Sequence, residues 1–544
     1  MTTDLMLADI WERVADAIPD RIALTQGDRA VTWYDYDDRA ARLATAFAAA
    51  GLAPDSKVGL FLYNCPEYAE AHFAAFKMRA VPVNINYRYL DDELEYLLDN
   101  SDCEALVYHT SLGERVERVR ARLPGLELLL EVDDGGGHRV AGAVPYEDAI
   151  AAHEPAARIT RDPGDRYMIY TGGTTGMPKG VMYDMGAFSE TFAGFGSTGL
   201  GRAPFGSIDE IVQLVGEQAE AGALQTATPC APMMHAAGMW LGVMLPHLLG
   251  GRVALLEGQS FDADELWATV ERERVNSLVM VGDAFGRPMV RALADRAAGG
   301  QPYDTSSLFA VLSTGAMLSA PVKEALLEQV PQMVIIDALG SSEGAMAQNI
   351  STKGADATTA HFEMMPGTKV FDEHDREIVP GSDAVGFVAV TGPNVPVGYY
   401  KDEEKSGRTF REIGGVRYSF PGDMATVDAD GTVSLLGRGS ACINTGGEKV
   451  YPEEVEETLK THPDVEDCLV FGLDDERFGQ RVVGVVSAAP EASPDPTAII
   501  EHARARLSHF KVPRELIVVD VVPRAPNGKA DYGTARTRFT GGGS

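Results

Sequence analysis

Cysteine and basic residues are scarce in this chain of 544 residues. Lysine and arginine number 47 against 80 aspartates and glutamates, which gives a formal net charge of −33. A nucleic-acid-binding protein usually presents a basic field, so this balance argues against a nucleic-acid partner. No CxxC pair occurs, which argues against a zinc site or a disulfide scaffold and favours a reduced cytoplasmic protein. The cysteines are Cys65, Cys103, Cys230, Cys442 and Cys468.

Long apolar runs are also missing. The longest, residues 239–251, contains His247 and is shorter than the roughly 18–20 residues that cross a bilayer, so we expect no transmembrane segment. The first residues, MTTDLMLADIWERV, carry early acid and no basic stretch, so we do not expect a signal peptide. The final GGGS, residues 541–544, is of low complexity, and we leave it out of the fold.

Ordinary globular composition and alternating elements predict an α/β fold. The chain is 45% hydrophobic and 23% charged, and its length suggests roughly three or four structural units. Short apolar strands at residues 58–62 and 105–108 alternate with amphipathic helices at residues 34–51 and 90–98. Such alternation favours a mostly parallel sheet covered by helices. Nothing before residue 165 indicates catalysis.

The most informative stretch is residues 170–180, which read YTGGTTGMPKG after a short apolar strand. Glycines let backbone N–H groups approach an anion, threonine hydroxyls add donors, and a lysine adds positive charge. The loop is not a Walker A motif, because no G-K-[ST] closes it. A surface turn is the alternative for such a loop when it is considered alone.

A second glycine-rich stretch leads to a different prediction. Gly194, Gly196 and Gly199 match G-x-G-x-x-G, but no apolar strand precedes them and no acidic residue follows at the right distance. We therefore expect a loop here and not a dinucleotide site. Residues 186–228 have few strand signals and predict helices and loops.

The loop YTGGTTGMPKG resembles the phosphate loop of the adenylate-forming superfamily, which includes acyl-CoA synthetases, peptide-synthetase adenylation domains and beetle luciferases. Further segments resemble family motifs in the expected order: residues 338–344 (ALGSSEG), 420–423 (FPGD), 437–440 (GRGS) and 524–529 (RAPNGK). The resemblance implies a large N-terminal adenylation domain of layered α/β sheets at residues 1–437. It includes a small β-barrel at about residues 365–437. A small mobile α+β domain at residues 438–540 then follows.

The resemblance also implies a nucleotide site. Glu343 and Thr171 would contact Mg²⁺, which prefers oxygen ligands. Asp423 would bind the ribose hydroxyls, Arg438 the ribose or phosphate, and Lys179 the β- and γ-phosphates. The remaining residues expected to bind ATP or AMP are Gly172, Gly173, Thr174, Thr175, Gly176, Ser313, Gly315, Ala316, Gly340, Ser341 and Ser342. Three positions depart from the family: Leu339 replaces an aromatic residue, Ser342 a threonine, and Pro421 a threonine.

The acid is expected to lie along Val281, Gly282 and Gly315, with His235 either lining or gating the pocket or serving as a core residue. Asp283 is either the N-cap of the following helix or a substrate contact, and the N-cap is preferred.

Two half-reactions follow from the resemblance. A carboxylate attacks the ATP α-phosphate and releases pyrophosphate, and Lys529 offsets the developing charge. The C-terminal domain then rotates about a hinge at Ser440. Gly446, Gly447, Glu448 and Lys449 line a tunnel for the CoA thiol. A CoA thiol is partly ionised near neutral pH, so no general base is required.

Residues 437–456, with NVPVGYYKDEEKS at residues 394–406, look closest to actinobacterial acyl-CoA ligases of fatty acids or steroid side-chain acids. That similarity implies a wide apolar pocket. Three alternatives stay open: an enzyme that loads a separate carrier protein, a luciferase-like oxidase, and a non-catalytic nucleotide-binding protein. A homodimer also stays open.

Overall fold

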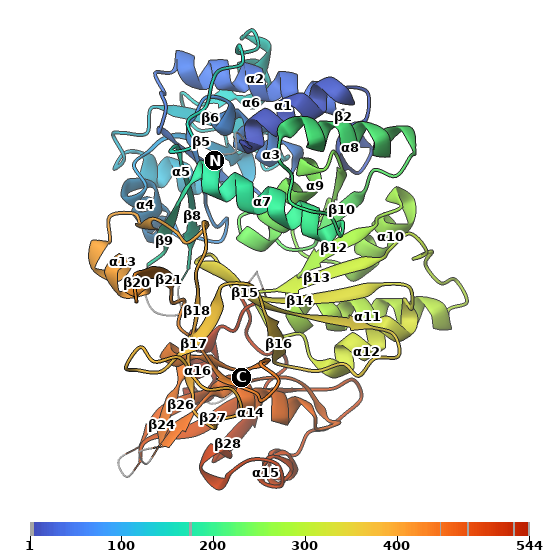
Figure 1. Cartoon of the computed structure of the whole chain (residues 1–544), viewed down its shortest axis with the longest axis vertical. Coiled ribbons are helices and arrows are strands. Elements are labelled where there is room, and N and C mark those ends of the chain that lie inside the picture. Colours follow the sequence, from blue (N-terminus) through green and yellow to red (C-terminus); the bar gives the residue numbers. More distant parts are fainter. Residues whose placement is uncertain (1–4, 173–176, 446–447, 476–477, 526–527, 542–544) are drawn as a thin grey trace.

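The computed structural model describes residues 5–172, 177–445, 448–475, 478–525 and 528–541. Helices and strands alternate over most of the chain, as the sequence predicts, and four sheets organise it. In Figure 1 the first sheet and its helices lie at the top, the largest sheet crosses the middle, and the C-terminal elements lie at the bottom. The α/β class and the separate C-terminal unit are therefore confirmed.

The first sheet is parallel and runs β4-β3-β5-β6-β7. Its strands are β3 (Lys57–Phe61), β4 (Val81–Asn84), β5 (Cys103–His109), β6 (Leu128–Val132) and β7 (Val144–Pro145). The N-terminal helices are α1 (Leu7–Ala17), α2 (Trp33–Ala49), α3 (Pro66–Lys77), α4 (Asp91–Asn100), α5 (Gly113–Arg120) and α6 (Tyr146–Ala151), with a 3₁₀ turn at Thr110–Leu112. The predicted helix of residues 34–51 is α2. Thr32 caps it by accepting from the Asp35 N–H, and it ends just before Gly51.

The largest sheet changes character along its length. It is parallel through the neighbours β1-β11-β10-β12-β13-β14 and antiparallel from β15 onward. Its first strands are β1 (Ile22–Gln26), β2 (Arg29–Thr32), β10 (Thr226–Pro229), β11 (Arg252–Leu255), β12 (Ser277–Met280), β13 (Ala310–Thr314), β14 (Val334–Ser341), β15 (Gly344–Thr352) and β16 (His361–Met364). The remaining ones are β17 (Thr368–Phe371), β18 (Gly386–Val390), β20 (Phe410–Ile413), β21 (Val416–Ser419), β22 (Asp423–Val427) and β23 (Val433–Arg438). The strands of the expected barrel thus pair as an extension of this sheet.

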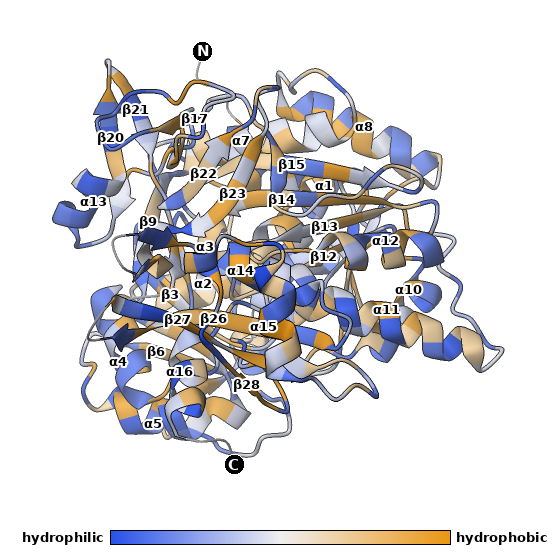
Figure 2. Ribbon diagram, turned by 90° about the horizontal axis from the view of Figure 1, so that it is seen from below, coloured by the Kyte–Doolittle hydropathy of each residue, from blue (hydrophilic) through white to orange (hydrophobic). Residues whose placement is uncertain are grey.

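Helices cover the large sheet, and their sequence explains where they lie. They are α7 (Met185–Gly199), α8 (Ile208–Glu220), α9 (Leu245–Leu248), α10 (Ala263–Glu273), α11 (Gly282–Ala298), α12 (Ala320–Gln329) and α13 (Glu403–Thr409). Figure 2 shows hydrophilic residues on outer helices such as α10 and α13 and hydrophobic residues along the inner strands.

The loop predicted for Gly194 to Gly199 is wrong, because these residues form the end of α7. A Cβ at Gly196 would lie 2.7 Å from Leu248 Cδ2. The glycine therefore permits close packing of α7 against α9, which the pattern alone does not reveal. The helices expected in residues 186–228 are confirmed by α7 and α8.

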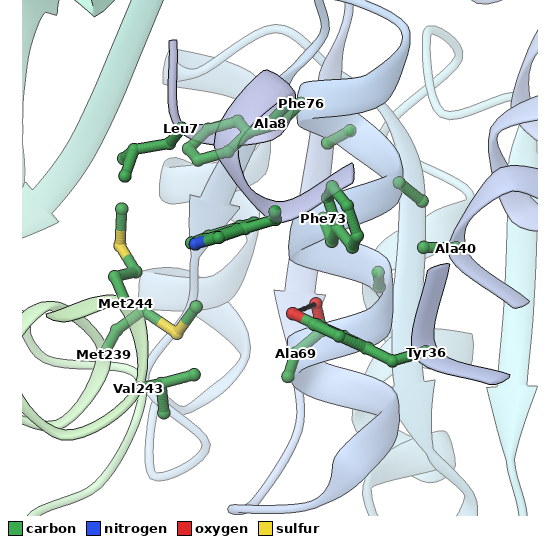
Figure 3. Close-up of a cluster of buried hydrophobic side chains, with 14 of the residues drawn as sticks. Leu7, Ala8, Tyr36, Ala40, Ala69, Phe73, Phe76, Met239, Val243 and Met244 are labelled. Carbon is green, nitrogen blue, oxygen red and sulfur yellow. Dashed lines mark hydrogen bonds between the residues drawn. The ribbon is translucent and has the colours of Figure 1, made fainter. Parts of the chain in front are cut away.

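A buried aromatic cluster holds the N-terminal helices against the middle of the chain. Trp11 of α1 stacks on Phe76 of α3 with ring centroids 6.0 Å apart. Met239 and Met244 join the same core from a π-helix at Ala237–Met244, and Figure 3 shows both side chains facing it. The segment that follows His235 is thereby fixed to the core.

The C-terminal unit has its own five-stranded sheet and core. Its elements are β24 (Ile443–Thr445), β25 (Glu448–Val450), α14 (Pro452–Lys460), β26 (Val465–Asp475), β27 (Gly479–Ala488), α15 (Pro496–Arg504), β28 (Glu515–Val518) and α16 (Tyr532–Thr540), with 3₁₀ turns at Gly439–Ala441 and His509–Lys511. Pro452 occupies the first position of α14, where its missing N–H costs nothing. The domain boundary at residues 437/438 stays a prediction.

No helix among the described residues is both long and apolar enough to cross a membrane. All five cysteines are free thiols.

Candidate functional site

A β-hairpin carries the phosphate loop. β8 (Arg166–Thr171) and β9 (Lys179–Asp184) pair antiparallel, and Thr171 lies opposite Lys179 where the loop begins and ends. Thr171, Gly172 and Lys179 all line one cavity. The other predicted loop residues, Gly173, Thr174, Thr175 and Gly176, lie outside the described residues.

The tight turn between β14 and β15 supplies the next wall. Ser341, Ser342 and Glu343 line the same cavity, and Gly340 precedes them in β14. The Tyr399 hydroxyl donates to Glu343 Oε1 at 2.8 Å, which orients this carboxylate. Tyr399 belongs to β19 (Gly398–Tyr399), which pairs with β9 and so ties this turn to the phosphate hairpin.

Arg438 also lines the cavity, and it pairs with Asp423, which does not line it. They face each other on β22 and β23, with Arg438 Nε 3.4 Å from Asp423 Oδ1. Burial raises the pKa of Asp423, although Arg438 opposes the shift. Asp423 Oδ2 is buried and has no hydrogen-bond partner among the described residues. A buried unpaired acceptor is costly, so this oxygen fits a pair of donor hydroxyls such as those of ribose.

Lys529 reaches this site from the C-terminal unit and lines the cavity together with Arg438 and Glu343. A Cβ at Gly315 would lie 3.6 Å from Lys529 Cε. Surrounding protein atoms desolvate the ammonium and, with repulsion from Arg438, lower the pKa of Lys529, while Glu343 and Asp423 oppose the shift. Gly528, which precedes Lys529, has a positive φ of +74° and lies close to Val281 and Ala284.

The cavity has a volume of about 120 Å³. Four of its lining residues have no role in the sequence-based site: Tyr399, Lys405, Thr409 and Pro421. Tyr399 and Lys405 lie in the run NVPVGYYKDEEKS, which carried family resemblance but no assigned chemistry. The sequence signal available for Tyr399 and Lys405 was their place in this run, where aromatic and lysine residues follow Gly398.

The side of the site where we expect the acid to bind is closely packed. Ser313 is buried at the end of β13 and accepts a hydrogen bond from the Gly282 N–H at 3.2 Å. Gly315 follows with φ of +84°, and a Cβ there would lie 3.7 Å from Val281 Cγ1. Ala316 continues the same turn. The residues lining the cavity do not include His235 or Val281 to Asp283.

His235 lies close to Lys529. Its Nε2 is buried and has no hydrogen-bond partner among the described residues. Burial and the neighbouring Lys529 lower the pKa of His235 to about 3, so the imidazole is neutral. An unpaired nitrogen near Lys529 suits a residue that faces a ligand better than a satisfied core histidine.

Asp283 is not the N-cap of α11, because Val281 holds that position and Asp283 lies in the first turn. The carboxylate accepts from the Ser319 N–H at 2.8 Å and pairs with Arg287 at 3.1 Å. The Asp283 N–H also donates to the Met317 carbonyl at 3.0 Å. Asp283 thereby braces the turn that contains Gly315, which favours a structural role over a substrate contact.

The expected CoA residues lie elsewhere. Glu448 and Lys449 are exposed on β25, and neither lines the cavity. Gly446 and Gly447 are outside the described residues. Ser440 lies in the 3₁₀ turn Gly439–Ala441 between the large sheet and the C-terminal unit. The hinge and the thiol tunnel stay predictions.

The donor set at Glu343 and Thr171 fits Mg²⁺. No group of three or more His, Cys, Asp or Glu side chains that could hold a metal occurs in the described ranges. Mg²⁺ needs only one or two carboxylates when substrate phosphates and water supply the other oxygens. Bound there, it would neutralise phosphate charge.

Comparison with known proteins identifies two matching families. Residues 11–400 match the family described as AMP-binding enzyme, and residues 454–529 match the AMP-binding enzyme C-terminal domain. A medium/long-chain-fatty-acid–CoA/3-oxocholest-4-en-26-oate–CoA ligase of Mycobacterium tuberculosis is 42% identical, covering 98% of this chain and 96% of that protein. A 3-oxocholest-4-en-26-oate–CoA ligase of Rhodococcus rhodochrous is 40% identical, covering 98% and 95%.

Solved structures share the fold. The anthranilate CoA ligase AuaEII in complex with anthranoyl-AMP superimposes with a TM-score of 0.83 at 24% identity, covering 98% of this chain and 97% of that one. A benzoate CoA ligase from Burkholderia xenovorans LB400 gives a TM-score of 0.78 at 20% identity, covering 97% and 99%.

Proposed function

The chain belongs to the AMP-binding enzyme family, and on that premise we propose that it is an ATP-dependent acyl-CoA ligase. It activates a hydrophobic carboxylic acid as acyl-AMP, releases pyrophosphate, and transfers the acyl group to CoA. Its small-molecule partners are the acid, ATP and CoA, with Mg²⁺ as cofactor.

One observation supports this proposal most strongly. A single cavity is lined by Lys179, Glu343, Arg438 and Lys529, and Asp423 pairs with Arg438 at its edge. Lys529 comes from the C-terminal unit, whereas the others come from the large sheet and the phosphate hairpin. A site completed by the C-terminal unit suits a first half-reaction that ends when that unit leaves.

Each residue has a role that follows from its place. Asp423 Oδ2 accepts from the ribose hydroxyls, and Arg438 holds the carboxylate of Asp423 beside them. Lys529 lies next to Gly315, where it neutralises the charge that develops between the attacking carboxylate and the α-phosphate. Thr171, Gly172 and Lys179 hold the phosphates that depart. Preorganised charges of this kind typically contribute about 10²–10³ in rate.

We further propose a fatty or steroid side-chain acid as the substrate. The support is the 40–42% identity over 98% of the chain to ligases named for medium- and long-chain fatty acids and 3-oxocholest-4-en-26-oate. Gly315 keeps the space beside the Lys529 side chain free of a Cβ, and His235 adds a neutral ring near the same lysine.

The test is thioester formation. Purified protein is incubated with ATP, Mg²⁺, a fatty acid or 3-oxocholest-4-en-26-oate, and CoA, and acyl-CoA and AMP are measured. We expect both products in equal amounts, and omission of CoA should stop turnover after adenylate formation. If the acyl group is transferred only to a carrier protein, the carrier-loading alternative replaces the ligase proposal. If the adenylate is consumed only in an oxygen-dependent reaction, the luciferase-like alternative replaces it.

A cytoplasmic location is proposed from the free cysteines. The homodimer stays a prediction that size-exclusion chromatography with light scattering can test.

A further inference from the structure

Lys405 projects into the phosphate end of the cavity from α13. This helix follows β19, the strand that contains Tyr399, and Asp402 caps it by accepting from the Lys405 N–H at 3.0 Å. The Lys405 side chain is half-buried and lines the cavity with Lys179 and Glu343.

Two ammonium groups share one aromatic ring. Lys179 Nζ lies 5.6 Å from the centroid of the Tyr399 ring, and Lys405 Nζ lies 5.4 Å from it. The ring is held by its backbone, because the Tyr399 N–H donates to Ser406 Oγ at 2.8 Å and β19 pairs with β9. Its hydroxyl is held by Glu343. The two lysines are therefore aimed at the same place by a rigid platform.

The negative charge around these lysines is small. The nearest carboxylate oxygen to Lys179 Nζ is Asp402 Oδ2 at 3.8 Å, and Lys405 has no ion pair with a carboxylate anywhere in the described ranges. Burial and the neighbouring Lys405 lower the pKa of Lys179 to about 8, while Asp402 and Glu343 oppose the shift. Cation–π attraction is about 0.5–1 kcal/mol at such partly exposed positions. It does not neutralise either charge.

We propose that Lys405 is a second cationic ligand of the departing pyrophosphate and acts with Lys179 across the Tyr399 ring. The proposal rests on the ligase function above and extends the phosphate site beyond the loop of residues 170–180. Pyrophosphate carries several negative charges on adjacent phosphorus atoms, so it can bridge two ammonium groups that repel each other when the site is empty.

The experiment compares Lys405→Met, Lys405→Arg and a matched control, Lys401→Met. Lys401 also lies over a tyrosine ring, 5.4 Å from the centroid of Tyr400, but it pairs with Asp102 at 2.8 Å outside the cavity. In ATP–pyrophosphate exchange we expect Lys405→Met to raise the KM for pyrophosphate roughly tenfold to a hundredfold, the usual scale for a charged hydrogen bond. The KM for the acid and the Kd for AMP should change less than threefold. Lys405→Arg should retain most of the affinity, and Lys401→Met should match the wild type.

An unchanged KM for pyrophosphate in Lys405→Met, or an equal loss of AMP affinity, would overturn the proposal. A wild-type enzyme that exchanges no pyrophosphate with any acid would instead overturn the ligase function.

Discussion

The two ends of the site are built from different material. At the phosphate end, charged and hydroxyl side chains line an open cavity around Lys179, Lys405 and Glu343. At the acid end, Gly282 lies against the carbonyls of residues 316 and 317, Gly315 lies against Val281, and Ser313 accepts from the Gly282 N–H. We propose from this contrast that charged groups determine the reaction, whereas the packing around these glycines determines which acid fits.

The largest expected effect is at Lys529, which lies between the two ends. Lys529→Ala should lower acyl-AMP formation by about 10²–10³, because it removes the charge placed beside the reacting oxygens. Thioester formation from supplied acyl-AMP and CoA should be nearly unaffected. The two half-reactions are measured separately, by pyrophosphate exchange and by acyl-CoA release.

Lys353→Ala is the control for Lys529→Ala, since Lys353 forms an exposed ion pair with Glu328 away from the cavity. Equal loss of both half-reactions in Lys529→Ala would contradict the rotation of the C-terminal unit.

A smaller effect is expected from Gly315→Ala, which adds one carbon to the acid end alone. The positive φ of Gly315 strains any other residue by about 1–2 kcal/mol, and the new Cβ would lie 3.6 Å from Lys529 Cε. We expect kcat/KM to fall about tenfold or more for bulky acids and less for short ones. Initial rates with acids of graded length measure this ratio.

AMP affinity is the internal control for Gly315→Ala. A uniform loss over all acids, with weaker AMP binding, would show that Gly315 serves the nucleotide and not the acid.

The smallest effect concerns the contact between the C-terminal unit and the large sheet. Glu453, in the first turn of α14, lies against Gly437, and burial together with Glu456 raises its pKa to about 8. Between the ordinary glutamate pKa of about 4.5 and about 8, the packed state binds more protons than the unfolded state. Stability therefore falls as the pH rises through this window, and the decline ends above it.

Glu453→Gln should flatten this part of the profile, because an amide has no proton to lose. Denaturant unfolding of both proteins at pH 5, 6, 7 and 8 makes the comparison. If unfolding stability depends on pH in the same way in both proteins, Glu453 is already ionised in the packed state.

Much of this arrangement follows from sequence, for identifiable reasons. Strand and helix periodicity predicted α2, α4 and the alternating N-terminal sheet. The phosphate hairpin and the Glu343 turn also coincide with quoted motifs, and these motifs place Thr171, Lys179 and Glu343 around one cavity.

The remaining features depend on tertiary contacts. The pattern of Gly194 to Gly199 predicts a loop because no apolar strand precedes it and no acidic residue follows at the right distance, yet these residues end α7, where Gly196 packs against Leu248. Asp283 read as a cap, although its partner Ser319 is 36 residues away in sequence. Lys405 was overlooked since its relation to Lys179 exists only when β19 pairs with β9.

The most direct measurement of the central claim is ATP–pyrophosphate exchange without CoA, over a panel of fatty acids of graded length and 3-oxocholest-4-en-26-oate. The predicted result is exchange that depends on the acid, needs Mg²⁺, and favours hydrophobic acids. Silence for every acid in the panel, with the protein folded and ATP bound, would contradict the account.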